Sequence, residues 1–378
     1  MRLSPAVWSS PVAHLKAEEP DQPMLYFAPA TLQATAERFL SGFPGLVTYA
    51  VKANDADTVL ENLVAAGLTA FDVASPYEMA KVRRVLPSAV LHYNNPVRSL
   101  AEIATAARMG VRSYSVDSLS ELAKLAGRVP ADSEISVRLK LPVKGAVYDF
   151  GAKFGATPER CAEILAEVAR LGFTPSMTFH PGTQCTDAGA WGIYIREAAR
   201  AAGIAGVRLA RLNVGGGFPS HRGGVAPDLE AIFDAIAAET AAAFGPDAPA
   251  LVCEPGRAMV AEAFTLGARI KAMRDDGAVF LNDGIYGGLA EAVILGSVER
   301  LAVVGEGGVA RTGAGEGRVV FGPTCDSLDR LPGQVLLPAD AVEGDWVLFH
   351  GMGAYSTATV TRFNGYGEIG MATVASAV

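Results

Sequence analysis

The stretch LVTYAVKANDADTVLENLVAAGLTAFDVAS, residues 46–75, contains the pattern that decides the fold. A β-type apolar run at 46–51 is followed by a segment with helical spacing at 57–66 and by a second short apolar run at 70–73. Two such runs separated by a helix are typical of parallel strands joined by a crossover helix. The stretch therefore predicts a strand–helix–strand unit.

The same alternation continues for about 230 residues, the size of a complete (β/α)8 barrel. Further strands are predicted at residues 90–93, 113–116, 135–139, 176–180, 209–214 and 250–254. Further helices are predicted at residues 76–86, 99–109, 118–126, 158–171, 188–202 and 229–244. The pattern favours an α/β fold with a (β/α)8 TIM-like barrel over residues 25–262. An open doubly wound sheet is the alternative that periodicity leaves open.

A β domain is predicted from residue 263 to residue 378, with residues 1–24 packing on it. Short β-type segments separated by Gly, Pro and Asp are typical of a mostly antiparallel arrangement. Strands are expected at residues 268–274, 278–282, 319–321, 334–338, 345–349 and 358–363. Residues 305–318 (GEGGVARTGAGEGR) hold few apolar groups and lack the phosphate-binding pattern G-x-x-x-x-G-K-[ST], so we expect a mobile loop there.

The composition excludes several classes of protein. Half of the 378 residues are hydrophobic and 19% are charged, which predicts a large buried core and argues against a disordered chain. The 40 acidic and 32 basic residues give a net charge of −8, so nothing indicates nucleic-acid binding.

The cysteines and the N-terminal sequence bear on the cellular setting. Cys161, Cys185, Cys253 and Cys325 form no C-x-x-C pair, which argues against zinc and against a disulfide scaffold. We interpret this as a reducing, cytoplasmic setting. The first 20 residues lack the apolar core of a signal peptide, and no uncharged apolar run of 18 residues occurs, so no membrane-spanning helix is expected.

Chemically useful residues follow several predicted strands, where barrel enzymes have their active sites. Lys52 follows the first strand, and burial would lower its pKa and make it a nucleophile. His180 ends another strand, where an imidazole can stack on a planar ring. The alternatives are a surface lysine and a hydrogen-bonded structural histidine.

Three further motifs add to this set. GGGFP, residues 215–219, lets backbone N–H groups approach a phosphate, although a triple glycine often marks only a turn. In CEPGRAMV, the Glu254 carboxylate could hold a protonated ring nitrogen, unless the motif is an ordinary charged turn. In GPTCDSLD, Cys325 is either reactive or a buried packing residue. A lysine, a phosphate cradle, an acid and a stacking histidine together match the needs of pyridoxal phosphate.

Nine motifs occur in order between about residue 25 and residue 371: YAVKAN, FDVAS, KFGAT, FHPGTQC, GGGFP, EPGR, GPTCDSLDR, GDWVLFHGMGAY and FNGY. In these motifs the sequence resembles the pyridoxal-phosphate decarboxylases of the ornithine decarboxylase family, whose barrel type is shared with alanine racemase. GPTCDSLD followed by GAY is more similar to ornithine and lysine decarboxylases than to diaminopimelate decarboxylases or racemases. The resemblance implies a homodimer with two shared active sites and no metal.

The resemblance also implies residue roles around the cofactor. The implied contacts are Lys52, Asp72, Arg138, His180, Thr183, Gly215, Gly216, Gly217, Glu254, Gly256, Arg257 and Tyr355. Lys52 would form a Schiff base with the cofactor aldehyde, His180 would stack on its ring, and Glu254 would pair with its ring nitrogen. The glycines, with Thr183, Arg257 and Tyr355, would contact the phosphate.

Two further residues, Cys325 and Asp326, would come from the partner subunit. Cys325 would protonate the substrate Cα after carbon dioxide leaves, and Asp326 would hold the distal amino group. Phe363 would line the substrate pocket, and Lys153 and Asp329 resemble an ion pair across the subunit interface.

The sequence departs from the family pattern in two places. Pro181 and Thr183 stand where valine and serine are usual, and threonine keeps the hydroxyl group. In residues 282–296 the usual second acid falls at Leu295, with Glu291 or Glu299 as candidate replacements. An ammonium group without its usual partner loses binding energy, which weakens the case for ornithine in particular.

The sequence therefore predicts decarboxylation of a basic amino acid, first L-ornithine or L-lysine to putrescine or cadaverine in polyamine biosynthesis. The alternative is a decarboxylase of a modified diamino acid in secondary metabolism. A racemase is disfavoured because it needs a base on each face of Cα, usually a tyrosine opposite the lysine. A non-catalytic regulator is disfavoured because such relatives lose cofactor residues that this chain retains, including Lys52 and Glu254.

Overall fold

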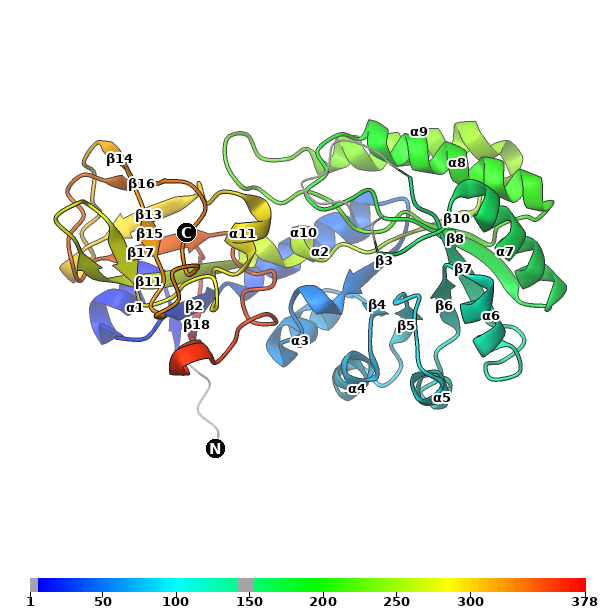
Figure 1. The fold of residues 1–378 in the computed structure, drawn as a ribbon, viewed down its shortest axis with the longest axis horizontal. Helices are drawn as coiled ribbons and strands as arrows, with labels where there is room; N and C mark the ends of the chain where they lie inside the picture. Colours follow the sequence, from blue (N-terminus) through cyan, green and yellow to red (C-terminus); the bar gives the residue numbers. More distant parts are fainter. Residues whose placement is uncertain (1–5, 142–152) are drawn as a thin grey trace. The chain divides into compact units, whose positions relative to one another are not determined.

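The computed structural model describes residues 6–141 and 153–378 and contains two compact units (Figure 1). The barrel unit comprises Ala36–Pro219 and Pro227–Ala258. The β unit comprises Met1–Thr35, Ser220–Ala226 and Met259–Val378.

Eight strands of the barrel unit close into a parallel barrel in the order β10-β3-β4-β5-β6-β7-β8-β9. Their bounds are β3 (Gly45–Ala50), β4 (Ala70–Val73), β5 (Val90–Tyr93), β6 (Ser113–Val116), β7 (Glu134–Arg138), β8 (Thr174–Thr178), β9 (Arg211–Asn213) and β10 (Ala250–Cys253). Each neighbouring pair is parallel, including the closing pair in which Val252 of β10 lies opposite Leu46 of β3. The predicted barrel is confirmed, and the open sheet is excluded.

Helices connect the barrel strands (Figure 1). They are α3 (Asp57–Ala65), α4 (Pro76–Val85), α5 (Leu100–Arg108), α6 (Leu119–Leu125), α7 (Pro158–Arg170), α8 (Gly189–Ala205) and α9 (Leu229–Phe244). Two more helices, α2 (Pro29–Gly42) and α10 (Arg257–Val260), contain residues of both units.

Side-chain caps fix where several of these helices begin. Ser75, Ser99 and Ser118 each accept a hydrogen bond from the backbone N–H three residues later, and Asp228 caps α9 in the same way. Such caps satisfy N–H groups that have no partner inside the helix. They define the loops that run from the carboxyl ends of the strands into the helices.

The main sheet of the β unit is mixed but mostly antiparallel, with path order β1-β18-β2-β11-β12-β15; β17 pairs with β11 and β13. Its strands are β1 (Val7–Trp8), β2 (Met24–Phe27), β11 (Phe264–Met273), β12 (Val279–Leu281), β13 (Leu301–Val304), β15 (Val320–Phe321), β17 (Trp346–His350) and β18 (Gly370–Val374). A separate pair joins β14 (Gly315–Arg318) and β16 (Val335–Pro338). The predicted mostly antiparallel β arrangement is thus confirmed.

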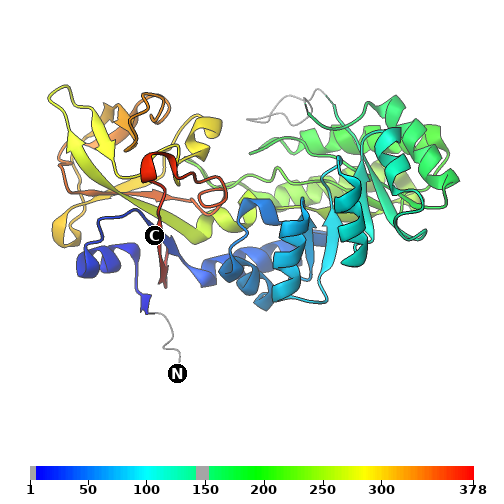
Figure 2. The same cartoon turned by 60° about the horizontal axis from the view of Figure 1, so that its bottom comes forward.

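The two chain termini contribute strands to this same sheet. β18 pairs in parallel with β2, so that Ala372 lies opposite Tyr26, and Figure 2 shows this pair near the C-terminus. Leu15 of α1 (Pro11–Glu18) packs with Tyr26 and Trp346 in the core of the unit.

Three local predictions were wrong. Residues 358–363 form a turn, an irregular segment and the start of η5 (Phe363–Gly365) rather than a strand, because Thr361 donates its backbone N–H to the Tyr286 carbonyl at 2.9 Å. Residues 305–318 are not wholly a loop, because β14 pairs with β16 through backbone bonds that need no apolar side chain. Strand β8 ends at Thr178 rather than at residue 180, before Pro181, which has no N–H for a ladder.

Within residues 6–141 and 153–378, no helix is long and apolar enough to cross a membrane. The same residues contain no group of three or more His, Cys, Asp and Glu side chains arranged to hold a metal ion.

Candidate active site

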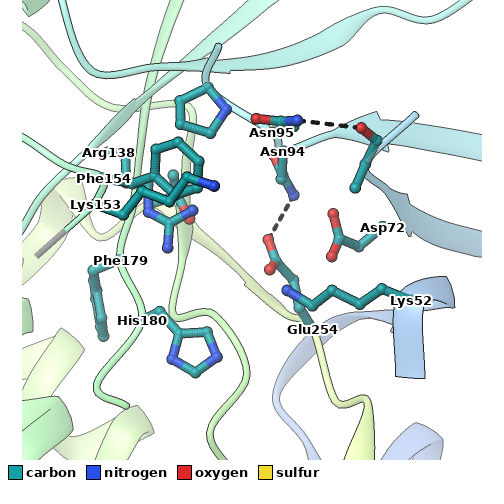
Figure 3. A pocket seen from close by; sticks show the side chains of 13 residues that line it. Lys52, Asp72, Asn94, Asn95, Arg138, Lys153, Phe154, Phe179, His180 and Glu254 are labelled. Carbon is teal, nitrogen blue, oxygen red and sulfur yellow. Dashed lines mark hydrogen bonds between the residues drawn. The ribbon is translucent and has the colours of Figure 1, made fainter. Parts of the chain in front are cut away.

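A cavity of about 220 Å³ lies at the carboxyl ends of the barrel strands (Figure 3). Its polar lining includes Lys52, Asp72, Asn94, Arg138, His180 and Glu254. These side chains come from the ends of six different strands. Parallel strands place such ends on one face of a barrel, which is why residues up to 200 apart in sequence meet here.

Lys52 lies in the single turn η1 (Val51–Ala53) that follows β3. The Tyr49 hydroxyl donates to the Asn54 carbonyl at 2.8 Å, and the Asn54 side chain accepts from the Ala56 N–H at 3.1 Å. These bonds hold the turn. Figure 3 shows the lysine side chain extending toward Glu254 and Asp72.

Glu254 and Asp72 are both buried acids, at 9% and 6% exposure. Burial raises the pKa of each carboxyl group, because a dry environment disfavours the charged form. The neighbouring Asp72 raises the pKa of Glu254 further, whereas Lys52 and Arg138 lower it. The site therefore holds two acids whose charge depends on nearby cations and hydrogen-bond donors.

Two asparagine amides donate to the same oxygen of Glu254. Nδ2 of Asn94 lies 2.5 Å from Oε1, and Nδ2 of Asn213 also donates to Oε1. Oδ1 of Asn213 accepts from the Gly215 N–H at 2.9 Å, which links the acid to the glycine loop. Sequence reasoning missed both asparagines, although each is a polar residue at the end of a predicted strand.

The loop of Gly215, Gly216 and Gly217 has no room for side chains. Gly215 and Gly217 have φ of 71° and 84°, and a Cβ at either would collide with a backbone oxygen. A Cβ on Gly216 would lie 2.7 Å from the Glu254 carbonyl oxygen and 3.2 Å from Nε2 of His180. Only glycine lets the backbone pass this close, as a phosphate cradle requires.

His180 lies in the loop after β8, and its Nδ1 accepts from the Gly182 N–H at 3.1 Å. Burial, helped by the charges of Lys52 and Arg138, holds its pKa well below the usual range. The ring is therefore neutral at pH 7 and fixed in orientation.

The other expected cofactor contacts lie around the same strand ends. Thr183 is half-buried in the loop that follows His180. A Cβ on Gly256 would lie 3.1 Å from Cβ of Ala53, so the loops after β10 and β3 pack tightly. Arg257 is buried at the start of α10.

The residues expected from a partner subunit belong to the β unit. Asp326 accepts from the Tyr286 hydroxyl at 2.6 Å, and the Tyr286 ring packs on Phe363 at 5.1 Å between centroids. The backbone N–H of the exposed Cys325 donates to the Asn364 side chain at 3.0 Å. We call Tyr286, Cys325, Asp326 and Phe363 the Cys325 face; sequence reasoning missed Tyr286.

The remaining expected residues lie elsewhere in the structure. Glu291 is buried at 5% exposure at the start of α11 (Glu291–Leu295). Tyr355, also in the β unit, has a left-handed φ of 62°. Asp329 is buried and accepts hydrogen bonds from the Ile285 and Thr324 N–H groups, while Lys153 lines the barrel cavity.

Residues 30–261 match the family model described as the pyridoxal binding domain of pyridoxal-dependent decarboxylases. The chain belongs to this family. It is 31% identical over 360 residues to the ornithine decarboxylase of Mus musculus, covering 87% of this chain and 75% of the relative. It is 32% identical over 329 residues to a lysine/ornithine decarboxylase of Selenomonas ruminantium, covering 85% and 81%. Decarboxylase flvG of Aspergillus flavus is 31% identical over 349 residues, covering 84% and 77%.

Solved structures of the family have the same fold. The Paramecium bursaria Chlorella virus arginine decarboxylase bound to agmatine superimposes with a TM-score of 0.85 at 26% identity, covering 95% of this chain and 98% of that chain. SrLDC in complex with PLP and cadaverine gives a TM-score of 0.82 at 28% identity, covering 99% and 94%.

The protein is a pyridoxal-phosphate-dependent decarboxylase, and its site fits this cofactor. The cavity offers a lysine amine and a buried carboxylate held by two amides, and a glycine loop with no space for Cβ atoms packs against His180 of its lining. These are the groups that an aldehyde, a ring nitrogen and a phosphate need.

Proposed function

We propose that the protein removes the α-carboxylate of a basic amino acid, with L-ornithine or L-lysine as the first candidates and putrescine or cadaverine as products. The observation that carries this proposal is the joint placement of Lys52 and Glu254 in one cavity, with the glycine loop packed against His180 of the cavity lining. The ornithine and lysine/ornithine decarboxylases among its relatives support the substrate class. The proposed setting is polyamine biosynthesis in the cytoplasm.

We propose for the cofactor the contacts that the family resemblance implies. Lys52 would hold the cofactor aldehyde, and Glu254 would keep a proton at the ring nitrogen; both residues line the cavity. Bound pyridoxal phosphate supplies an electron sink for the electron pair left behind by carbon dioxide. Neutral His180 would stack on the ring, and the glycine loop, Thr183, Gly256 and Arg257 would bind the phosphate. The family resemblance adds Tyr355 as a further phosphate contact. Asp72 and Arg138 set the charge around Lys52 and Glu254.

The Cys325 face completes the site of a partner subunit in a homodimer. Cys325 delivers a proton to the substrate Cα, and Asp326 binds the distal ammonium group. Phe363 shelters the substrate carboxylate from water, and Glu291 is a further acid of the substrate-binding segment. The exposure of Cys325 and the 43% exposure of Phe363 support a role at a surface that another subunit covers.

Mixing two variants that each form little amine tests the shared site, with amine formation as the measured activity. Lys52→Ala and Cys325→Ala damage different residues of one site, so a mixed dimer regains one intact site. Random mixing should restore about one quarter of wild-type activity. The same mixture without activity would contradict a site shared between subunits.

A substrate panel tests the reaction. Carbon dioxide release would be measured from cofactor-loaded protein with L- and D-ornithine, L- and D-lysine, arginine, diaminopimelate, 2,4-diaminobutyrate and N-acylated ornithine. Preference for L-ornithine or L-lysine supports the proposal. Bound cofactor without turnover of any free diamino acid would contradict it.

A decarboxylase of a modified diamino acid is the second candidate, and Leu295 favours it. This half-buried residue supplies no carboxylate where the family usually has a second acid. A distal group without a positive charge would not need that acid. Faster turnover of N-acylated ornithine than of ornithine would support this candidate.

A further inference from the structure

Asn94 lies directly after β5, beside both buried acids of the cavity. Its Nδ2 atom donates to Oε1 of Glu254 at 2.5 Å. Hydrogen bonding by the same amide lowers the pKa of Asp72. Figure 3 shows the Asn94 side chain directed at Glu254, with Asp72 next to it. One side chain thus contacts two acids that belong to different strands.

The second amide on Glu254 makes the arrangement directional. Asn213 donates to Oε1 as well, and its own oxygen is taken by the Gly215 N–H. Because both amides bind the same oxygen, Oε2 is the oxygen that can accept from a ring N–H. Two charge-assisted bonds on one atom also restrict rotation of the carboxylate.

The orientation of Asn94 favours the ionised acid. An amide donor stabilises a carboxylate, whereas an amide oxygen turned toward it would repel it. Burial and the charge of Asp72 oppose ionisation of Glu254, and Lys52 and Arg138 support it. Oδ1 of Asn94 is buried and has no hydrogen-bond partner among residues 6–141 and 153–378. The residue thus leaves one polar atom unsatisfied while its donor serves the acid.

We propose that Asn94 is a positioning residue that keeps Glu254 ionised and directed at the ring nitrogen of the bound cofactor. It touches neither the substrate nor the reacting carbon in this role. Its contribution passes through Glu254, so it depends on a nitrogen being present in the ring. This inference rests on the cofactor and is independent of the substrate.

Cofactor binding to the apoprotein tests this dependence. Dissociation constants would be measured for wild type and Asn94→Leu with pyridoxal phosphate and with 1-deazapyridoxal phosphate, which has a carbon in place of the ring nitrogen. Leucine has the same branching at Cγ and the same number of side-chain heavy atoms as asparagine but no donor. The substitution should raise the dissociation constant for pyridoxal phosphate by about tenfold or more, since hydrogen bonds to charged groups are the strong ones. The dissociation constant for the deaza analogue should rise by less than about twofold, since this analogue makes no hydrogen bond to Glu254 through a ring nitrogen.

An equal rise of both dissociation constants would overturn the proposal, because a structural defect does not distinguish the two rings. Unchanged binding of both would overturn it as well. Asn94→Ala provides a second variant if the leucine variant does not fold, and the ratio of its two dissociation constants should move in the same direction.

Asn95→Leu is the matched control. Its amide lines the same cavity but donates to the Ala74 carbonyl at 3.4 Å rather than to an acid. The ratio of the two dissociation constants should stay at the wild-type value. A change in this ratio as large as that of Asn94→Leu would show that any lost amide has this effect, and the proposal would fail.

The pH dependence of binding gives an independent readout. Without Asn94 the pKa of Glu254 should rise further, so the acid is lost to protonation at a higher pH. The acid limb of pyridoxal phosphate binding should therefore move upward in pH in Asn94→Leu. Asp72, Lys52 and Arg138 face the same acid and remain unchanged, so a limb that stays in place would overturn the proposal.

Discussion

Tyr286 and Asp326 share a hydrogen bond of 2.6 Å. Oδ2 of Asp326 accepts from the tyrosine hydroxyl, and Oδ1 accepts from the Leu328 N–H at 3.0 Å. Both bonds hold the pKa of Asp326 below its usual range. The acid proposed to bind the distal ammonium group is therefore ionised and held in one orientation before a substrate arrives.

Tyr286→Phe should weaken substrate binding more than it slows decarboxylation. Without the tyrosine donor the Asp326 carboxylate is no longer held in one orientation, so kcat/KM for the diamino acid should fall by about twofold to fivefold. Most of the change should appear in KM, measured by steady-state carbon dioxide release. Tyr77→Phe, at a tyrosine 64% exposed on α4, is the control. A wild-type KM in Tyr286→Phe would contradict this role of the bond.

Gly216→Ala should reduce cofactor affinity. The backbone of Gly216 has no positive φ, so the loss comes from contacts of the new Cβ, 2.7 Å from the Glu254 carbonyl oxygen. Such overpacking costs about 1–3 kcal/mol, equivalent to a cofactor complex weaker by about fivefold to 150-fold. Fluorescence titration of the apoprotein measures it.

Gly203→Ala is the control for this substitution. Gly203 lies inside α8 with nothing within 4 Å of a new Cβ, so alanine should leave cofactor affinity unchanged and raise stability by about 0.5–1 kcal/mol. Equal cofactor affinity in Gly216→Ala and wild type would contradict the predicted contact.

Cys325→Ala should retain the cofactor and lose most clean amine production, because the proton donor to Cα is gone. The absorbance of the bound cofactor and the yield of amine per carbon dioxide measure the two effects. Amine formed at the wild-type rate would exclude this assignment of Cys325.

His92 should make the apoprotein less stable in acid. Burial lowers its pKa from 6.5 to about 4, with a further contribution from Arg211, so the folded state holds a neutral ring. The unfolded state then binds more protons below pH 6.5, and this stability falls as the pH decreases toward about 4. Between pH 7.5 and pH 5 the loss from this group should be about 2 kcal/mol.

Urea unfolding at the two pH values measures this loss, and His92→Gln should remove it. The same substitution at His221, a half-exposed residue, should keep the wild-type difference. An undiminished acid loss in His92→Gln would assign the effect to other groups.

The barrel was predictable because its strands and helices alternate with a local pattern. β4, β5, β6 and α9 have the predicted bounds, since burial and capping act within each segment. The end of β8 at Thr178 was not predictable from this pattern, because the chain leaves the barrel before Pro181. The strand predicted at residues 358–363 does not form for a similar reason. Thr361 donates its N–H to the Tyr286 carbonyl instead of to a neighbouring strand.

The site was only partly predictable from motifs. Lys52, His180 and Glu254 follow strands and line one cavity, as the motifs indicated. Asn94 was missed because its bond to Glu254 spans 160 residues, which no local pattern records. Tyr286 was missed because its bond to Asp326 joins two loops that the sequence does not place together.

The proposal that Lys52 holds the cofactor aldehyde is tested most directly by locating the cofactor on the chain. Among residues 6–141 and 153–378, Lys52 and Lys153 are the lysines that line the cavity, and only Lys52 is proposed to hold the aldehyde. Borohydride reduction of the holoenzyme fixes the cofactor to its lysine, and peptide mass mapping then identifies that residue. We expect the pyridoxyl group on the peptide that contains Lys52, and we expect no pyridoxyl group on that peptide in Lys52→Ala. A pyridoxyl group on Lys153, or on any other lysine, would contradict the account.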